Sequence, residues 1–210
     1  MNEDSRAKPL RQRFRETAKS EVLDAAVRVF SRDGVTEARI DAIAAEAGVS
    51  VGTVYNLFGD RAGLVGAVLD RGRDEFIELV ATFFETSGDA PFEQRIRGMV
   101  HLLIGHMRGH WPMLRMLSAA DSPDGRCGPG VPAPPASMVR AIHGRMCTLV
   151  QHGIDDGVLG PIDVHVATCA LMGAIRTTID VDLNLGLDAP SEARADAIVQ
   201  LFLEGAARRP

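Results

Sequence analysis

The sequence predicts an all-α protein in which a small amino-terminal head of three helices precedes a larger helical body, with about nine helices in all. Apolar residues recur at the three- and four-residue spacing of helices along most of the 210 residues. Glycine, proline and aspartate separate these segments and mark their ends. No segment alternates apolar and polar residues as a half-buried strand does, so we expect no sheet.

The composition is that of a globular protein. Apolar residues make up 46% of the chain, and no apolar run reaches the roughly 18 residues that a membrane span requires. The first residues lack the apolar core of a secretion signal, so we expect a cytoplasmic protein without a membrane partner. The three cysteines are expected to be reduced. Cys127 is open to oxidation, whereas Cys147 and Cys169 fall in helical patterns and are expected to be small buried hydrophobes.

Charge is distributed unevenly along the chain, whose net charge is −5. Residues 1–19 carry six basic and three acidic groups, whereas residues 74–210 carry 11 basic and 17 acidic groups. A basic front on an acidic body fits a DNA-reading module carried by a body that does not contact DNA. A charged terminus that is simply solvated is the alternative interpretation.

The first expected helix runs from Phe14 to Arg32, and Gly34 closes it. Residues 1–13 are polar and contain Pro9. We expect them to form a disordered basic arm that can reach the minor groove of DNA.

The stretch from Ile40 to Phe58 has the pattern of a helix-turn-helix. Gly48 ends its first helix, because glycine adopts a positive φ without steric cost, and Ser50 can cap the second helix. In that second helix an apolar face around Val54 points inward. Two short helices joined in this way place the second one in the major groove of DNA.

The outward face of the second helix carries Gly52, Thr53, Tyr55 and Asn56. Threonine and asparagine can bond base edges, and tyrosine can donate to a phosphate. A glycine inside a helix costs roughly 1 kcal/mol relative to alanine, which indicates that another molecule approaches the backbone closely at Gly52. A helical hairpin inside a core is the alternative interpretation.

The same stretch resembles the DNA-binding region of the TetR family of transcriptional regulators. The matching residues are Ile43-Ala44, Ala47-Gly48-Val49-Ser50, Gly52-Thr53-Val54-Tyr55, Phe58 and Leu64, with Ala25-Ala26, Phe30 and Gly34 upstream. Arg39 and Leu57 depart from the family pattern, and Arg61 replaces a lysine that contacts phosphate. The resemblance and the pattern together give the expected DNA-binding residues as Arg39, Ser50, Val51, Gly52, Thr53, Tyr55, Asn56 and Arg61.

The body is expected to begin with one long helix over residues 61–86, which at 1.5 Å per residue is roughly 39 Å long. A rod shared by head and body can act as a lever. We expect a helix over 92–108, a break, and then a separate short helix that opens at His110-Trp111-Pro112. A loop is expected over 121–136, followed by helices over 137–156, 162–183 and 191–207. The predicted domains are a disordered arm (1–13), a helix-turn-helix DNA-binding domain (14–60) and a ligand-binding and dimerisation domain (61–210).

The last two helices are expected to form a dimer interface. The helix over 162–183 is apolar nearly all round, which requires more partners than one small domain supplies. A two-fold four-helix bundle would cover it, although a core helix within one chain is the alternative. The resemblance also implies a homodimer, and the expected interface residues are Val166, Ala170, Gly173, Ala174, Ala193, Ala197 and Leu201.

The resemblance further implies a pocket for a small effector in the body. Flexible methionine side chains adapt to varied apolar ligands, although such a stripe is also ordinary core. The expected pocket residues are Phe83, Met99, His101, Leu103, Met107, Trp111, Met146, Met172 and Arg176. No cofactor is expected. His106 and His110 have helical spacing, but the expected break at Trp111-Pro112 spoils the geometry, so no metal site is predicted.

The leading hypothesis is a repressor that binds a palindromic double-stranded operator and leaves it when a small apolar or amphipathic effector binds. The alternative is a DNA-binding regulator without a small ligand, controlled by a protein partner or by cysteine oxidation. An enzyme is not expected, because the sequence has no nucleophile beside a base, no phosphate cradle and no paired carboxylates in an apolar setting.

Overall fold

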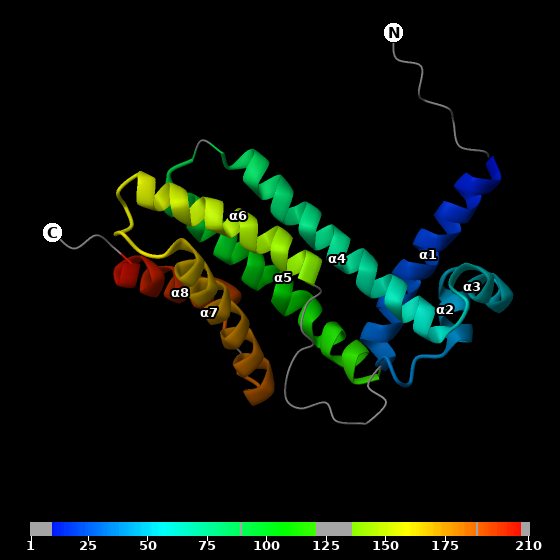
Figure 1. Cartoon of the computed structure of the whole chain (residues 1–210). Coiled ribbons are helices and arrows are strands. Elements are labelled where there is room, and N and C mark those ends of the chain that lie inside the picture. Colours follow the sequence, from blue (N-terminus) through cyan, green and yellow to red (C-terminus); the bar gives the residue numbers. More distant parts are fainter. Residues whose placement is uncertain (1–9, 89, 121–135, 188, 207–210) are drawn as a thin grey trace, which may run out of the picture. The chain divides into compact units, whose positions relative to one another are not determined.

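The computed structural model describes residues 10–88, 90–120, 136–187 and 189–206, and there the fold is all-helical, which confirms the predicted class (Figure 1). The eight helices are α1 (Leu10–Asp33), α2 (Ile40–Glu46), α3 (Val51–Phe58), α4 (Arg61–Thr86), α5 (Phe92–Ala120), α6 (Ala136–Asp155), α7 (Val164–Leu185) and α8 (Ser191–Ala206). Within these residues no helix is both long and apolar enough to cross a membrane.

Two helices differ from the sequence prediction. Helix α1 begins at Leu10 rather than Phe14, so residues 10–13 of the expected arm are helical, while residues 1–9 lie outside the described part. Helix α5 is one helix through Pro112, where we expected a break and a separate short helix. A proline removes one backbone hydrogen bond, and the remaining bonds of this 29-residue helix carry it past that position. The expected 121–136 loop and Cys127 lie outside the described residues, apart from Ala136.

The chain divides into two compact units. Among the described residues, the first comprises those up to Gly72 together with Met116–Ala120, and the second comprises Arg73–Arg115 and those from Ala136 onward. Helix α4 therefore contributes residues to both units. The predicted domain boundary between residues 60 and 61 stays a prediction.

The first unit has a core built from one face of each helix. From α1 the buried residues are Val22, Leu23, Ala25, Ala26, Val29 and Phe30; the others are Val35, Ala38, Ile43, Ala44, Val54, Leu64, Val65 and Val68. The three- and four-residue spacing of these positions is the amphipathic pattern from which the helices were predicted. Arg71 of α4 donates to Asp24 of α1 at 2.7 Å and adds an ion pair within this unit.

The second unit has a separate core to which all of its helices contribute. Its largest buried side chains are Ile96, Met99, Ile104, Met146, Leu149, Leu159, Leu171 and Ile175. Helices α6 and α7 pack against each other, and α7 packs against α8. Asp182 is 3% exposed and accepts two hydrogen bonds from Arg194, at 2.8 and 2.9 Å, which tie the end of α7 to the start of α8.

The two helical cysteines are not buried as we expected. Cys169 is exposed and Cys147 is half-buried. Helix α7 is so uniformly apolar that its sequence pattern does not specify which face turns inward. The inward face carries Ala167, Leu171 and Ile175, and Cys169 lies outside that row.

Gly63 is required at the junction between α3 and α4. A Cβ atom added there would lie 2.1 Å from the carbonyl oxygen of Phe58, whereas a Cβ added at Gly66, one turn later, would meet nothing within 4 Å. We therefore expect Gly63→Ala to destabilise the protein by roughly 1–3 kcal/mol, the usual cost of overpacking. Gly66→Ala should stabilise it by about 0.5–1 kcal/mol through helix propensity. Urea unfolding of the two variants measures this, and equal midpoints would contradict it.

Candidate nucleic-acid interface

The turn between α2 and α3 fixes the orientation of α3. Gly48 has a φ of +67°, and two hydrogen bonds close the end of α2, from Gly48 N to Ala45 O at 3.2 Å and from Val49 N to Ala44 O at 3.0 Å. This pair of bonds is the Schellman motif, which needs a left-handed residue at that point. The chain then leaves α2 in one defined direction.

Ser50 begins α3 as its N-cap. Its Oγ accepts a hydrogen bond from Thr53 N at 3.1 Å and lies 2.9 Å from Thr53 Oγ1. The cap satisfies one of the free N–H groups at the helix start. The hydroxyls of Ser50 and Thr53, both predicted DNA-binding residues, thus contact each other, and in this geometry they order the helix start.

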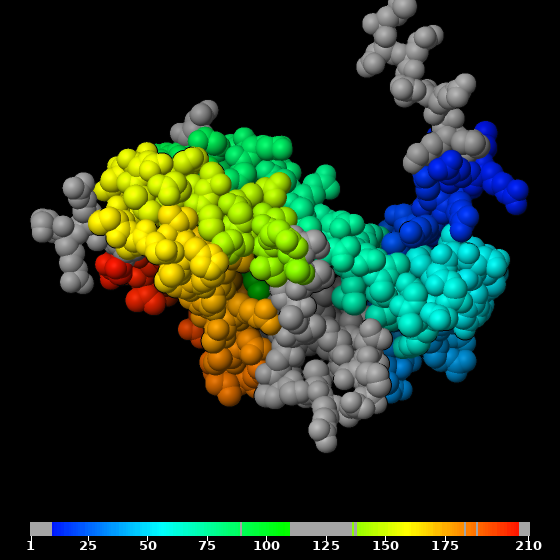
Figure 2. Space-filling view, viewed as in Figure 1, coloured from blue at the N-terminus to red at the C-terminus, as the bar shows by residue number. Residues whose placement is uncertain are grey.

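Helix α3 buries one side and exposes the other. Val54 is 2% exposed, whereas Val51 and Tyr55 are 39% and 46% exposed and Gly52 and Asn56 are also exposed. In Figure 2 the segment from α2 to α3, in light blue to cyan, forms part of the surface of the first unit. An eight-residue helix therefore offers an unobstructed outer row within this unit.

Arg61, a predicted DNA-binding residue, contacts the backbone of its own chain, and its contact with DNA stays a prediction. Its guanidinium donates hydrogen bonds to the carbonyl oxygens of Val35, Ala38 and Thr36, the last at 3.3 Å. The start of α4 is thereby tied to the connection between α1 and α2. These contacts make Arg61 a positioning residue for α3, because α3 ends three residues before it.

Arg39 occupies the N-cap position of α2 without capping it. Its guanidinium instead forms a two-pronged ion pair with Asp41, at 2.8 and 3.1 Å, and both side chains are exposed. The hydrogen bond from Arg39 lowers the pKa of Asp41. Exposed pairs of this kind are weak, so a phosphate can compete for Arg39.

A polar depression of about 390 Å³ lies beside the outer row of α3. It is lined by Thr36, Glu37, Ala38, Arg39, Ile40, Asp41, Val51, Tyr55 and Arg61. The structure thus brings Arg39, Val51, Tyr55 and Arg61 to one surface, with Gly52 and Asn56 exposed on the same short helix.

Sequence reasoning missed the ion pairs that join α1 to α2. Glu46 accepts a hydrogen bond from Arg28 at 2.9 Å and lies 3.6 Å from Arg32, which also pairs with Asp33 at 2.8 Å. The hydrogen bond from Arg28 lowers the pKa of Glu46, and the bond from Arg32 lowers that of Asp33. Arg28 and Glu46 lie on different helices and 18 residues apart in the sequence. The periodicity of a single helix therefore cannot predict that their charges pair.

Residues 22–68 match the family described as bacterial regulatory proteins, tetR family. This segment contains the turn at Gly48 and the whole of α3. The matched segment is thus of the TetR type. The family consists of regulatory proteins, which confirms the expectation that the chain is not an enzyme.

A curated relative is also a transcriptional regulator. It is an HTH-type transcriptional repressor of Streptomyces coelicolor, 30% identical over 102 residues. The match covers 49% of this chain and 48% of the repressor, so the chain spans about half the length of the relative it matches.

Solved structures share the fold over most of the chain. A TetR-family regulator from Mesorhizobium loti has a TM-score of 0.71 and 20% identity, covering 92% of this chain and 98% of its own. The regulator FadR from Bacillus subtilis, solved with stearoyl-CoA, has a TM-score of 0.65 and 17% identity, covering 89% and 98%. At these identities the likeness establishes the fold.

The residues predicted to bind an effector are dispersed through the second unit. Met99, Leu103 and Met146 are core residues, and Phe83, Met107 and Met172 pack against that core. His101 Nε2 lies 3.1 Å from Asp196 Oδ1. Arg176 is half-buried, and the side chain of Trp111 lies outside the described part. None of them lines the apolar groove between α7 and α8.

The residues predicted for the dimer interface share one surface property. They are exposed or half-buried on α7 and α8: Val166, Ala170, Gly173, Ala174, Ala193, Ala197 and Leu201. Val166, Ala170, Ala174 and Leu201 help to line the groove between the two helices.

The ion pair at Glu46 predicts an acid-sensitive part of stability. Because its pKa is lower in the folded chain than in the unfolded one, its contribution is fully present above the ordinary glutamate pKa of about 4.3 and is lost as the pH falls through the folded-state value. Glu46→Gln should therefore lower the melting temperature at pH 7, and the difference should vanish in acid below the folded-state pKa. Circular dichroism melts across this range test it. A difference that persists unchanged in acid would contradict the assignment, and Arg28→Gln should add little in the Glu46→Gln background.

Proposed function

We propose that this chain is a transcriptional repressor that binds a palindromic operator as a homodimer through the outer row of α3. The observation that carries the proposal is the division of α3 into a buried side at Val54 and an exposed side at Val51, Gly52, Tyr55 and Asn56. A helix that projects such a row after a tight turn fits the major groove. The family match over residues 22–68 supports this use.

Two residues of the row and two nearby arginines have separate roles in this proposal. Asn56 bonds a base edge, and the Tyr55 hydroxyl donates to a phosphate. Arg39 releases Asp41 and pairs with a DNA phosphate, because the exposed ion pair between Arg39 and Asp41 is weak. Arg61 acts indirectly by holding the start of α4 against the connection between α1 and α2.

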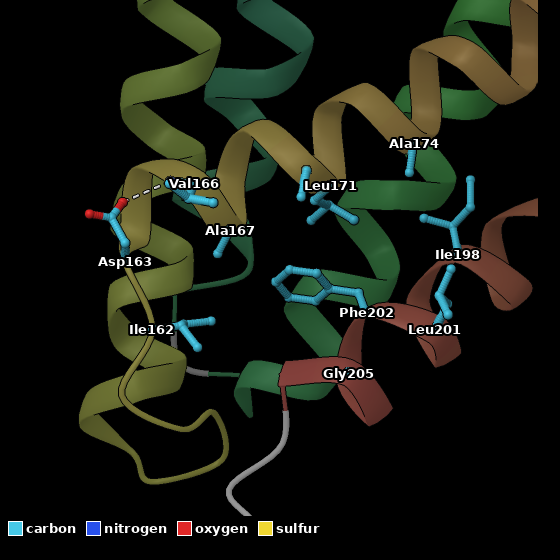
Figure 3. Close-up of a pocket in the computed structure, with 11 residues that line it drawn as sticks. Ile162, Asp163, Val166, Ala167, Leu171, Ala174, Ile198, Leu201, Phe202 and Gly205 are labelled. Carbon is cyan, nitrogen blue, oxygen red and sulfur yellow. Dashed lines mark hydrogen bonds between the residues drawn. The ribbon is translucent and has the colours of Figure 1, made fainter.

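The second copy is proposed to cover the surface of α7 and α8. Val166 is 63% exposed and Leu201 is 71% exposed, and both line an apolar groove of about 590 Å³. Figure 3 shows Ala167, Leu171 and Phe202 directed into the space between the two helices. A Cβ added at Gly173 would meet nothing within 4 Å in this chain. Close approach of a partner helix would explain a glycine there, as in a two-fold four-helix bundle.

An effector is proposed to act through α4. This 26-residue helix belongs to the first unit up to Gly72 and to the second unit from Arg73. A ligand that binds one arrangement of the second unit better than another shifts the equilibrium by that difference in affinity. The methionines of the second core adapt to apolar ligands, and the B. subtilis regulator FadR was solved with stearoyl-CoA. A small apolar or amphipathic compound is therefore the proposed effector class.

Gly52→Ala separates folding from DNA binding. A Cβ at this position would meet only Ser50 Oγ, at an ordinary 3.7 Å, and alanine favours helix by up to about 1 kcal/mol. We expect the variant to be as stable as the wild type or more stable, but to bind DNA at least tenfold more weakly, because the added methyl group meets the DNA backbone or bases.

The measurement is fluorescence anisotropy with a duplex from the promoter region that flanks the coding sequence. Ala45→Ser, an exposed substitution on α2, is the control and should leave the affinity unchanged. Unaltered affinity of both Gly52→Ala and Tyr55→Ala would refute the assignment of α3 as the reading helix.

Leu201→Glu tests the proposed dimer face. A charge buried without a partner in an apolar interface costs several kcal/mol, so the variant should be monomeric by light scattering at micromolar concentration and should lose most of its operator affinity. Leu79→Glu places the same charge at a leucine of α4 that is 41% exposed, and it should remain dimeric. If the Leu201→Glu protein is still dimeric, the dimer interface does not lie at Leu201 and the assignment is wrong.

A further inference from the structure

The second unit brings together two histidine–cysteine pairs that the proposed function does not use. His143 and Cys147 lie four residues apart on α6, and His165 and Cys169 lie four residues apart on α7. Side chains four residues apart on a helix point to the same side. Because α6 and α7 pack against each other, the two pairs meet.

The potential ligand atoms of three of these residues converge. One nitrogen of His143, one nitrogen of His165 and the Cys169 sulfur all lie within 4.8 Å of one another. Cys169 Sγ is 3.8 Å from His143 Nε2 and 3.7 Å from His165 Nε2. The imidazole rings have centroids 4.9 Å apart and cross at 61°, so they converge without stacking flat.

Cys147 adds a second thiol that contacts His143. Its Sγ lies 3.6 Å from His143 Nδ1 and 3.7 Å from Nε2. Cys147 is half-buried, like His143, whereas His165 and Cys169 are exposed. The Cys147 sulfur is within one residue's reach of the cluster, because it already contacts the ring of one of the three converging groups.

We propose that His143, His165 and Cys169 bind a divalent zinc ion, with Cys147 as the fourth ligand. In tetrahedral zinc sites the metal lies about 2.3 Å from sulfur and about 2.0–2.1 Å from nitrogen, which separates neighbouring ligand atoms by roughly 3.5 Å. The sulfur–nitrogen separations of 3.7 and 3.8 Å are within a few tenths of an ångström of that value. The sulfur therefore needs only a small shift toward each nitrogen, and the two histidine nitrogens, which lie within 4.8 Å of each other, must close to roughly 3.4 Å around the ion.

The donor set selects the class of metal. Thiolate and imidazole prefer zinc and other borderline or soft ions, whereas calcium and magnesium require oxygen ligands. Binding converts each ligating thiol to a thiolate and releases its proton to solvent, with no change of oxidation state. The exposure of His165 and Cys169 gives the ion a direct path of entry.

A bound ion would join α6 to α7 on a side of α7 next to the proposed dimer face. His165 and Cys169 directly precede Val166 and Ala170 in the chain. A ligand that binds only the folded chain raises its stability by mass action, so zinc should raise the melting temperature. The proposal does not depend on DNA binding, because its readouts concern the metal and the folded chain alone.

The experiment uses the untagged full-length chain with the substitution Cys127→Ser, which leaves Cys147 and Cys169 as the only thiols. Cobalt(II) serves as the spectroscopic probe. We expect the visible absorption of tetrahedral cobalt together with a thiolate-to-cobalt charge-transfer band, saturating at one ion per chain and displaced by zinc. Zinc should also raise the melting temperature by several degrees.

Variants of exposed residues identify the ligands with little risk to the fold. Cys169→Ser and His165→Gln should each weaken cobalt binding at least tenfold and remove the thermal shift. Cys147→Ser should roughly halve the charge-transfer intensity, because one of two thiolates is lost. His152→Gln, an exposed histidine on α6 whose ring lies 3.2 Å from Arg95, is the matched control and should bind as the parent does.

Two results would overturn the proposal. One is unchanged cobalt binding by Cys169→Ser and His165→Gln. The other is saturation at one ion per two chains, which would mean that ligands from separate copies build the site.

Discussion

The left-handed turn at Gly48 is the constraint on which the rest of the first unit depends. A helix of eight residues is too short to be stable alone in water, so α3 exists because the structure on both sides specifies it. The Schellman bonds at Gly48 and the Ser50 cap define its start, Val54 anchors it in the core, and the Arg61 guanidinium holds the helix that follows. The exposed row of α3 can be rigid because none of these contacts uses it.

Local patterns predicted most of the fold because they are set by neighbours in sequence. Helix α4 has the predicted bounds, 61–86, and Asp60 caps it by accepting from Gly63 N at 2.7 Å. The failure at Pro112 shows the limit of the same reasoning. Proline removes one backbone hydrogen bond from a helix, but the other hydrogen bonds of the 29-residue helix α5 are enough to keep it continuous.

The outer row of α3 was also predictable, because it consists of the residues on the side of the helix opposite the apolar residues that face the core. What could not be predicted was which charged groups were already engaged. Arg39 pairs with Asp41 and Arg61 binds backbone carbonyls, and both contacts depend on how turns and helices meet. The histidine–cysteine cluster was missed for the same reason, because each pair is ordinary alone and its meaning arises where α6 packs on α7.

The first unit presents α3 with its exposed outer row, and the second unit carries two distinct surfaces on α7. One side of α7 lines an apolar groove with α8, and another side offers imidazole and thiol groups. These two surfaces differ in chemistry, so a second copy of the chain and a metal ion can bind α7 without competing for the same residues.

Selection of binding sites from a random duplex DNA pool with the full-length chain is the sharpest test of DNA recognition by the outer row of α3. We expect enrichment of an inverted repeat whose half-sites are about 34–36 Å apart from centre to centre, or a multiple of one helical turn. Replacement of both Tyr55 and Asn56 by alanine should abolish the enrichment. Failure to enrich any sequence, or enrichment of the same sequence by that double variant, would contradict this assignment of α3.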